Sequence, residues 1–195
     1  MVTHDGAVIA AAALDDPSAA SAAADPVPEV DKAVEPDPRD VARQIVLRQL
    51  AMAPRSRAEL AQKLAQRGCP AEVADAVLDR MTQVGLVDDE AYAHMLVRTQ
   101  QAGRGLARRA LARELRTKGI EGELADEALS SITDEDERDR ARALVDKKLR
   151  AMHGLGLEVQ TRRLAGMLAR KGYSPSLSYA VIREAVADAP EHLPD

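Results

Sequence analysis

The sequence of 195 residues contains no phenylalanine or tryptophan, only three tyrosines and a single cysteine. Large aromatic side chains are too few to build a core, so Leu, Val, Ala, Ile and Met must supply it. The lone Cys69 excludes an internal disulfide and is typical of a protein of the reducing cytoplasm. A composition rich in Ala, Leu, Arg and Glu favours helices.

Long apolar runs are also absent. No stretch approaches the roughly 18–20 apolar residues of a membrane helix, so we expect no membrane span. The short apolar stretch at 7–14 follows no basic residue and precedes Asp15 and Asp16, which argues against a secretory signal.

Motifs for catalysis and metal binding are missing as well. No two of the four histidines have the sequence spacing of metal ligands, and none has that spacing from Cys69. The histidines are His4, His94, His153 and His192. There is no GxxxxGK[ST] phosphate loop and no GxSxG nucleophile motif. We therefore expect a protein without catalytic residues, without a metal or cofactor, and without enzymatic activity.

Negative charge is concentrated near the N-terminus. The net charge is −5, but residues 1–40 hold nine acids and two bases (−7), which leaves 23 acids and 25 bases (+2) for residues 41–195. Residues 1–37 are rich in Ala, Asp and Pro and nearly lack large apolar side chains, which predicts a disordered acidic tail. We also expect a flexible C-terminus over 189–195.

One short pattern, L-x3-L-x3-G, occurs three times, at offsets of 51 and 53 residues. Its leucines fit the buried stripe of a helix, and its glycine fits a left-handed helix end. We predict an all-α fold of three tandem three-helix repeats, over 38–89, 90–133 and 134–188. The members of the pattern are Leu60, Leu64 and Gly68; Leu111, Leu115 and Gly119; and Leu164, Leu168 and Gly172.

The second repeat carries most of the arginine. Its basic residues are Arg98, Arg104, Arg108, Arg109, Arg113, Arg116 and Lys118, and Glu114 is the one acid among residues 98–118. On a helical wheel Arg109, Arg113 and Arg116 fall within about 60° of one another, opposite the leucines. Charged faces are often merely solvated, but like charges three and four residues apart repel. The pattern favours an anionic partner, either a phosphate backbone or an acidic protein surface.

An acidic turn, Asp88-Asp89-Glu90, separates the first two repeats. Its simplest interpretation is a helix N-cap followed by acids in the first turn. A contact with a partner is the alternative for these three residues, and Arg162 and Lys171 of the third repeat are two further candidates for such a contact.

The stretch GLVDDEAYA at 85–93, followed by Arg104-Gly105 and by EL-x-x-KGI at 114–120, resembles the RecX family of bacterial modulators of the RecA recombinase. The resemblance covers about residues 41–187. It implies an elongated curved array of tandem three-helix repeats. It also implies that the array binds the groove of the RecA–single-stranded-DNA filament and inhibits ATP hydrolysis and strand exchange. Carried over by position, Gly85 to Tyr92 match the acidic turn of the family. Arg104, Arg113, Lys118 and Gly119 match its basic second-repeat helix.

Two other classes remain open. Three-helix units can act as helix-turn-helix DNA-binding regulators, although the basic stripe occurs in one repeat and no dimerisation element is evident. The other class is a scaffold for protein–protein interactions. We expect a cytoplasmic monomer with the RecA filament as partner, contact with its single-stranded DNA, and weak direct binding of DNA.

Overall fold

The computed structural model describes residues 37–188, which form nine α-helices and one short 3-10 helix and contain no strand. The predicted acidic tail, apart from Asp37, and the predicted flexible C-terminus lie outside the described residues. The helices are α1 (Pro38–Met52), α2 (Arg57–Gln66), α3 (Ala71–Gln83), α4 (Asp89–Arg104), α5 (Arg108–Thr117), α6 (Glu123–Ser130), α7 (Asp134–Leu149), η1 (Arg150–Met152), α8 (Leu157–Arg170) and α9 (Pro175–Ala187).

Local sequence sets where several helices begin. Ser56 begins α2 with a capping box, because its hydroxyl accepts a hydrogen bond from the Glu59 N–H and the Glu59 carboxylate accepts one from the Ser56 N–H. Thr133 and Asp136 form a second capping box on α7. Asp88 caps α4 by accepting from the Ala91 N–H at 2.8 Å, as the simplest interpretation of the acidic turn predicted.

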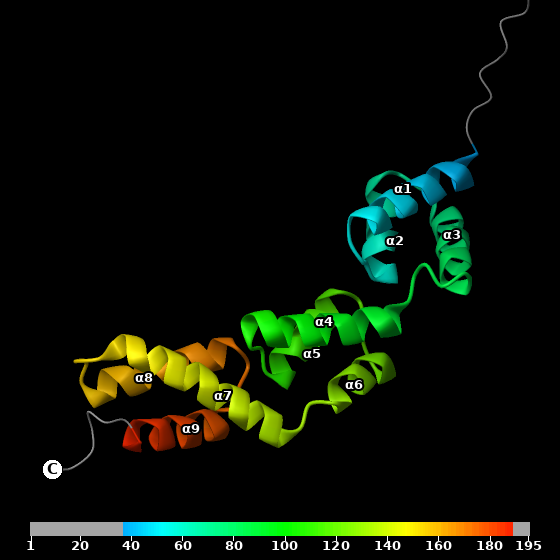
Figure 1. The fold of residues 1–195 in the computed structure, drawn as a ribbon. Coiled ribbons are helices and arrows are strands. Elements are labelled where there is room, and N and C mark those ends of the chain that lie inside the picture. The colour runs from blue at the N-terminus through cyan, green and yellow to red at the C-terminus, as the bar shows by residue number, and fades with distance from the viewer. Residues whose placement is uncertain (1–36, 189–195) are drawn as a thin grey trace, which may run out of the picture. The chain divides into compact units, whose positions relative to one another are not determined.

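The helices form three groups of three, and each group packs around its own apolar core (Figure 1). The paired leucines of the recurring pattern are almost completely buried in every copy, which confirms that they are core residues. One apolar position differs between the repeats: Leu124, five residues after the second closing glycine, is 41% exposed, whereas its counterparts Val73 and Leu177 are partly buried.

The closing glycines of the second and third copies have a further role at the junctions between repeats. Gly68, Gly119 and Gly172 all adopt the predicted left-handed conformation, with φ of 75°, 73° and 91°. A Cβ atom on Gly119 would lie 2.3 Å from the Cβ of Ala58, and one on Gly172 would lie 2.6 Å from that of Ala110. For Gly68, nothing in the described part of the chain lies within 4 Å of such an atom. Two of the glycines therefore allow one repeat to approach the next.

The close approach brings a helix end onto a helix start. The last carbonyls of a helix lack partners within it, and so do the first N–H groups. At the first junction the Lys118 carbonyl accepts from the Ser56 hydroxyl at 2.6 Å. At the second, the Lys171 carbonyl accepts from the Ala107 N–H at 2.9 Å. The donors differ because the Ser56 N–H is already bound to Glu59, whereas Ala107 has no side chain that could serve as a cap.

A carboxylate completes each junction. The N–H of Arg57, the first residue of α2, donates to Asp89 of α4 at 2.8 Å. The N–H of Arg108, the first residue of α5, donates to Glu137 of α7 at 2.6 Å. In both cases the first helix of the next repeat supplies an acid to the N-terminus of the middle helix before it, where negative charge is favoured.

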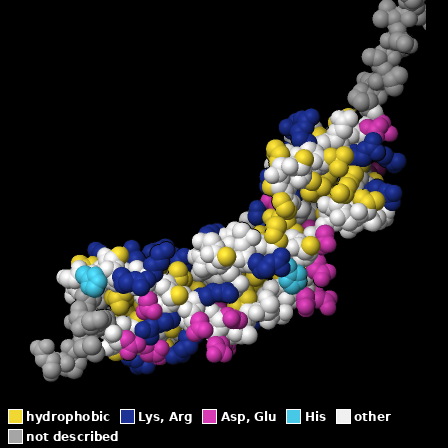
Figure 2. Space-filling view, viewed as in Figure 1, with side chains coloured by type: hydrophobic (Ala, Val, Ile, Leu, Met, Phe, Trp, Pro, Cys, Tyr) yellow, Lys and Arg dark blue, Asp and Glu magenta, His cyan; other side chains and the backbone are white. Residues whose placement is uncertain are grey.

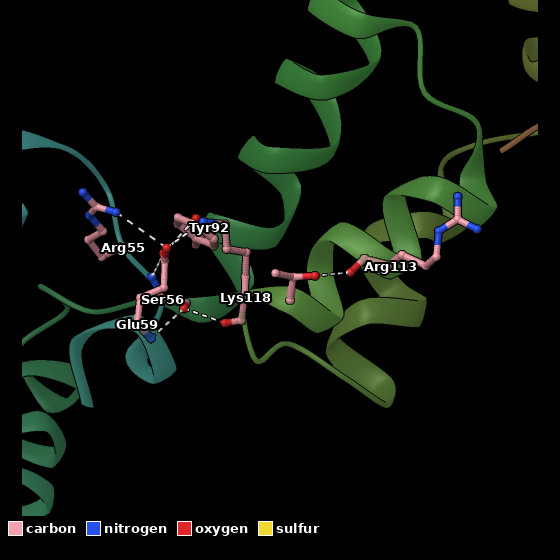
Figure 3. Close-up of polar contacts among 7 residues, drawn as sticks. Arg55, Ser56, Glu59, Tyr92, Arg113 and Lys118 are labelled. Atoms are coloured by element: carbon pink, nitrogen blue, oxygen red, sulfur yellow. Dashed lines mark hydrogen bonds and ion pairs between the residues drawn. The ribbon is translucent and has the colours of Figure 1, made fainter. Parts of the chain in front are cut away.

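A polar cluster around Glu59 lies at the first junction (Figure 3). Glu59 accepts hydrogen bonds from the Lys118 ammonium at 2.6 Å and from the Tyr92 hydroxyl at 3.1 Å, and pairs with Arg55 at 3.6 Å. Burial raises the pKa of the Glu59 carboxyl, but the hydrogen bonds from Lys118, Ser56 and Tyr92 outweigh it and hold the pKa below its usual value. Burial and the Glu59 charge raise the pKa of Tyr92 to about 12.

The second junction uses the same residue types with backbone acceptors. The Lys171 ammonium donates to the Arg104 carbonyl, and the Tyr173 hydroxyl donates to the Gly105 carbonyl at 3.1 Å. Ala107 itself is buried in the core of the third repeat. The end of α4 and the start of α5 are thus held against the third repeat by both polar and apolar contacts.

We predict that Gly→Ala substitutions separate the two roles of the glycine. Gly68→Ala should cost about 1–2 kcal/mol, because only the left-handed backbone is strained. Gly119→Ala and Gly172→Ala should each cost about 1–3 kcal/mol more, because a methyl group is forced into a neighbouring repeat. Denaturant melts of the three variants measure the free energies of unfolding.

A second substitution tests the contact itself. Ala58→Gly should offset much of the Gly119→Ala loss, since the next nearest atom, the Ala58 Cα, is 3.8 Å away. Ala110→Gly should not rescue Gly172→Ala, because the backbone N and Cα of residue 110 remain 2.7 and 3.1 Å from the new Cβ. Equal losses for all three glycines would show that the repeats are not in close contact.

Glu59→Gln should change how stability depends on pH. The folded-state pKa of Glu59 is depressed, so its stabilising contribution is complete above the unfolded value near 4.5 and is lost as the pH falls through the folded pKa. Wild-type protein should therefore melt at higher temperature than Glu59→Gln at pH 7, and the difference should shrink towards pH 3. A difference in melting temperature that stays constant from pH 7 to pH 3 would contradict the prediction.

Candidate partner-binding surface

The strongest candidate surface is the stripe of Arg109, Arg113 and Arg116 on α5, called here the α5 stripe. All three side chains are exposed, while Leu111 and Leu115 on the opposite side of the helix are fully buried. Figure 3 shows Arg113 directed away from the Glu59 cluster. The stripe is therefore separate from the junction and is open to solvent.

Little of the positive charge of the α5 stripe is neutralised. Among residues 37–188, neither the Arg109 nor the Arg113 guanidinium forms an ion pair or a hydrogen bond. Arg116 lies 3.7 Å from Glu121, with both side chains about two-thirds exposed, and such pairs contribute little to stability. Arg108 and Arg109 also stand in the first turn of α5, which holds no acid and where the helix dipole disfavours cations.

The other basic residues of the second repeat divide into two groups. Arg98 on α4 and the Arg108 side chain are exposed and form no ion pair in the described part of the chain. Arg104 instead pairs with Glu114 at 2.9 Å, and Lys118 pairs with Glu59 at 2.6 Å. Arg104 and Lys118 therefore serve contacts within the chain, whereas the remaining arginines point to solvent.

The remaining sequence candidates also differ in their surroundings. Asp88 caps α4 and Asp89 binds the N-terminus of α2, so both carboxylates are engaged within the chain, whereas Glu90 is exposed. Lys171 lies at the second junction, with its ammonium on the Arg104 carbonyl. Arg162 is exposed on α8.

Two features of the charged surface outside the α5 stripe were not predicted from the sequence. The junction cluster around Glu59 joins residues 33 and 59 positions apart, and no local pattern marks such a pairing. The second feature is a basic hollow on the third repeat, lined by Lys148, Arg162, Arg163 and Arg170. The adjacent arginines Arg162 and Arg163 in the middle of a helix were the available signal for it.

Over residues 37–188 there is no group of three or more His, Cys, Asp or Glu side chains placed to hold a metal ion. None of the helices in the same range is long and apolar enough to cross a membrane. Cys69 is a free, partly buried thiol.

Comparison with known proteins identifies the repeats. Residues 42–81, 88–129 and 134–182 match the family models described as the first, second and third three-helix domains of RecX. These segments contain the helices that pack around the three separate cores. The predicted all-α fold of three-helix repeats is confirmed.

Curated relatives match over most of the chain. Regulatory protein RecX of Streptomyces coelicolor is 48% identical over 92% of this chain and 98% of its own length. Regulatory protein RecX of Thermobifida fusca is 49% identical over 73% of this chain and 77% of its own, and that of Mycolicibacterium smegmatis is 42% identical over 85% and 90%.

Solved structures share the fold. The crystal structure of RecX from Lactobacillus salivarius has a TM-score of 0.68 at 21% identity, over 76% of this chain and 97% of that one. A second crystal structure, of a regulatory protein RecX, has a TM-score of 0.66 at 27% identity, over 76% and 72%. With three matching domains and relatives near 50% identity, this chain belongs to the RecX family of regulatory proteins.

Proposed function

We propose that this protein is a cytoplasmic, monomeric and non-enzymatic regulator of the RecA recombinase. It binds in the groove of the RecA–single-stranded-DNA filament and suppresses ATP hydrolysis and strand exchange. Membership of the RecX family supports a role in regulation. The observation that carries the proposal is the α5 stripe, whose charge is neutralised within residues 37–188 only by the exposed Arg116–Glu121 pair.

The stripe supports an anionic partner because the fold does not need it. The corresponding positions of α2 hold Ala58, Gln62 and Ala65, and α2 packs its leucines as well as α5 does. Repulsion between Arg109, Arg113 and Arg116 costs a few tenths of a kcal/mol for each pair. A surface that costs stability and is not needed for packing is expected to serve binding. Guanidinium groups bind phosphate oxygens through two parallel hydrogen bonds, which suits the DNA of a filament.

The surroundings of α5 argue against a helix-turn-helix regulator that reads duplex DNA with this helix. A recognition helix places its N-terminal residues at base edges in the major groove. Here the N-terminus of α5 is covered, since Ala107 is buried in the third repeat and the Arg108 N–H is bound to Glu137. The side of α5 remains accessible to a partner, and a stripe of arginines along the side of a helix can bind the phosphates of a nucleic-acid backbone.

Replacing Arg109, Arg113 and Arg116 together by Glu should abolish inhibition of the RecA ATPase on single-stranded DNA. Folding should be preserved, because the three side chains are exposed and point away from the core. If the partner atoms are phosphates, the log–log salt dependence of filament binding should also flatten by about two to three units. Titrations of ATPase activity and of filament binding measure the two effects, and circular dichroism checks the fold.

The matched control reverses three arginines of the first repeat, Arg48, Arg67 and Arg80. They are exposed, form no ion pair within the described residues, and change the net charge by the same amount when replaced by Glu. This variant should still inhibit RecA. Full inhibition by the folded α5 variant would refute the proposed role of the stripe. Lost inhibition with an unchanged salt slope would identify an acidic protein surface as the partner.

A further inference from the structure

A basic hollow of about 530 Å3 lies on the third repeat, where the end of α7 and η1 meet α8. Its walls carry Lys148, Arg162, Arg163 and Arg170, all of them exposed. The apolar lining consists of Ala151, Met152, Gly166 and Met167, and no carboxylate takes part. On the face drawn in Figure 2, Lys and Arg side chains gather along one edge of the α7–α9 bundle.

The four cations of the hollow have no partner within residues 37–188. Lys148 and Arg170 stand in the last turns of their helices, where the helix dipole favours cations. Arg162 and Arg163 lie in the middle of α8 and gain nothing from the dipole. Glu158 stands one turn before Arg162 without forming an ion pair with it. Neither an ion pair nor the helix dipole therefore accounts for the presence of Arg162 and Arg163 in the hollow.

A missing side chain opens the hollow. Gly166 lies four residues after Arg162 and four before Arg170, so all three share one face of α8, and the arginines are about 12 Å apart along the axis. A Cβ on Gly166 would lie 3.4 Å from Nη1 of Arg170. The other middle helices have Gln62 and Arg113 at the position of Gly166, which would fill this space.

An apolar surface adjoins the hollow through a shared residue. Arg162 also lines a second depression of about 600 Å3, together with Leu157, Glu158, Thr161, Ala165 and Tyr179. Leu157 is 52% exposed and Tyr179 is 60% exposed. The chain has three tyrosines, and the other two, Tyr92 and Tyr173, are buried at the junctions. One side of Arg162 therefore offers cations, and the other offers an exposed aromatic ring.

We propose that the third repeat carries a binding site for a single nucleic-acid strand, distinct from the α5 stripe. Phosphates lie over the hollow, on the guanidinium groups of Arg163 and Arg170 and on the Lys148 ammonium. A neighbouring base stacks on Tyr179 against Leu157. Proteins that bind single strands combine a basic groove along the backbone with aromatic side chains for the bases. In a duplex the base faces are already stacked and cannot reach Tyr179, and an acidic peptide would have no use for the ring.

This inference goes beyond the proposed regulation of RecA, and its test needs no RecA. Anisotropy of a labelled oligothymidylate, titrated with the full chain over a salt series, measures binding of the strand. Arg163→Gln with Arg170→Gln should weaken binding and flatten the log–log salt slope by about 1.4, the value for two phosphate contacts on a single strand. Tyr179→Ala should weaken binding about 5- to 150-fold, and Tyr179→Phe should retain it because the stacking ring remains.

Two controls separate the parts of the site. Arg48→Gln with Arg80→Gln removes the same charge from the first repeat and should leave the affinity unchanged. On an abasic strand, Tyr179→Ala should bind like wild type, while the change at Arg163 and Arg170 should still weaken binding. If the Arg48/Arg80 variant lost as much affinity for the strand as the Arg163/Arg170 variant, the hollow would not be a binding site. Equal affinity of Tyr179→Ala and wild type for oligothymidylate, or tighter binding of duplex than of the single strand, would overturn the proposal of a single strand.

Discussion

The fold depends on the contact between the end of one middle helix and the start of the middle helix before it. A helix that ends in a tight left-handed turn presents carbonyls without partners, and a helix start presents N–H groups without partners. At both junctions the Lys carbonyl at the helix end receives a hydrogen bond from the N-cap residue of the preceding repeat. The approach is possible because Gly119 and Gly172 have no Cβ atom.

This constraint explains why a sequence pattern with two leucines also needs its glycine. The leucines belong to the core of their own repeat, whereas the glycine belongs to the contact with the previous one. In the first copy only the backbone conformation calls for the glycine, since nothing lies within 4 Å of a Cβ atom placed on Gly68. The helix-end conformation could be predicted from the sequence. The contacts of Gly119 with Ala58 and of Gly172 with Ala110 could not, because they join residues about 60 positions apart.

The same reasoning applies to the charged residues. Local rules predicted the cap at Asp88 and the exposed side of α5, because neighbours in sequence decide both of them. Local rules did not show that Lys118 has a different role from the α5 arginines, because its partner Glu59 belongs to another repeat. The role of Asp89 could not be predicted for the same reason, since its partner, the N–H of Arg57, also belongs to another repeat. Charges at the ends of the middle helices hold the repeats together, and charges along their sides remain for partners.

Because the junctions engage both ends of α5, they also position the α5 stripe. The N-terminus is held by Glu137 and by the burial of Ala107, and the C-terminus by Ser56 and Glu59. A helix of ten residues held at both ends presents its arginines in fixed directions, which lowers the entropy lost on binding. The middle helices share one packing frame, but their sides differ: α2 carries few charges, α5 a stripe and α8 a hollow. Repetition of the frame thus leaves each side free to acquire its own binding chemistry.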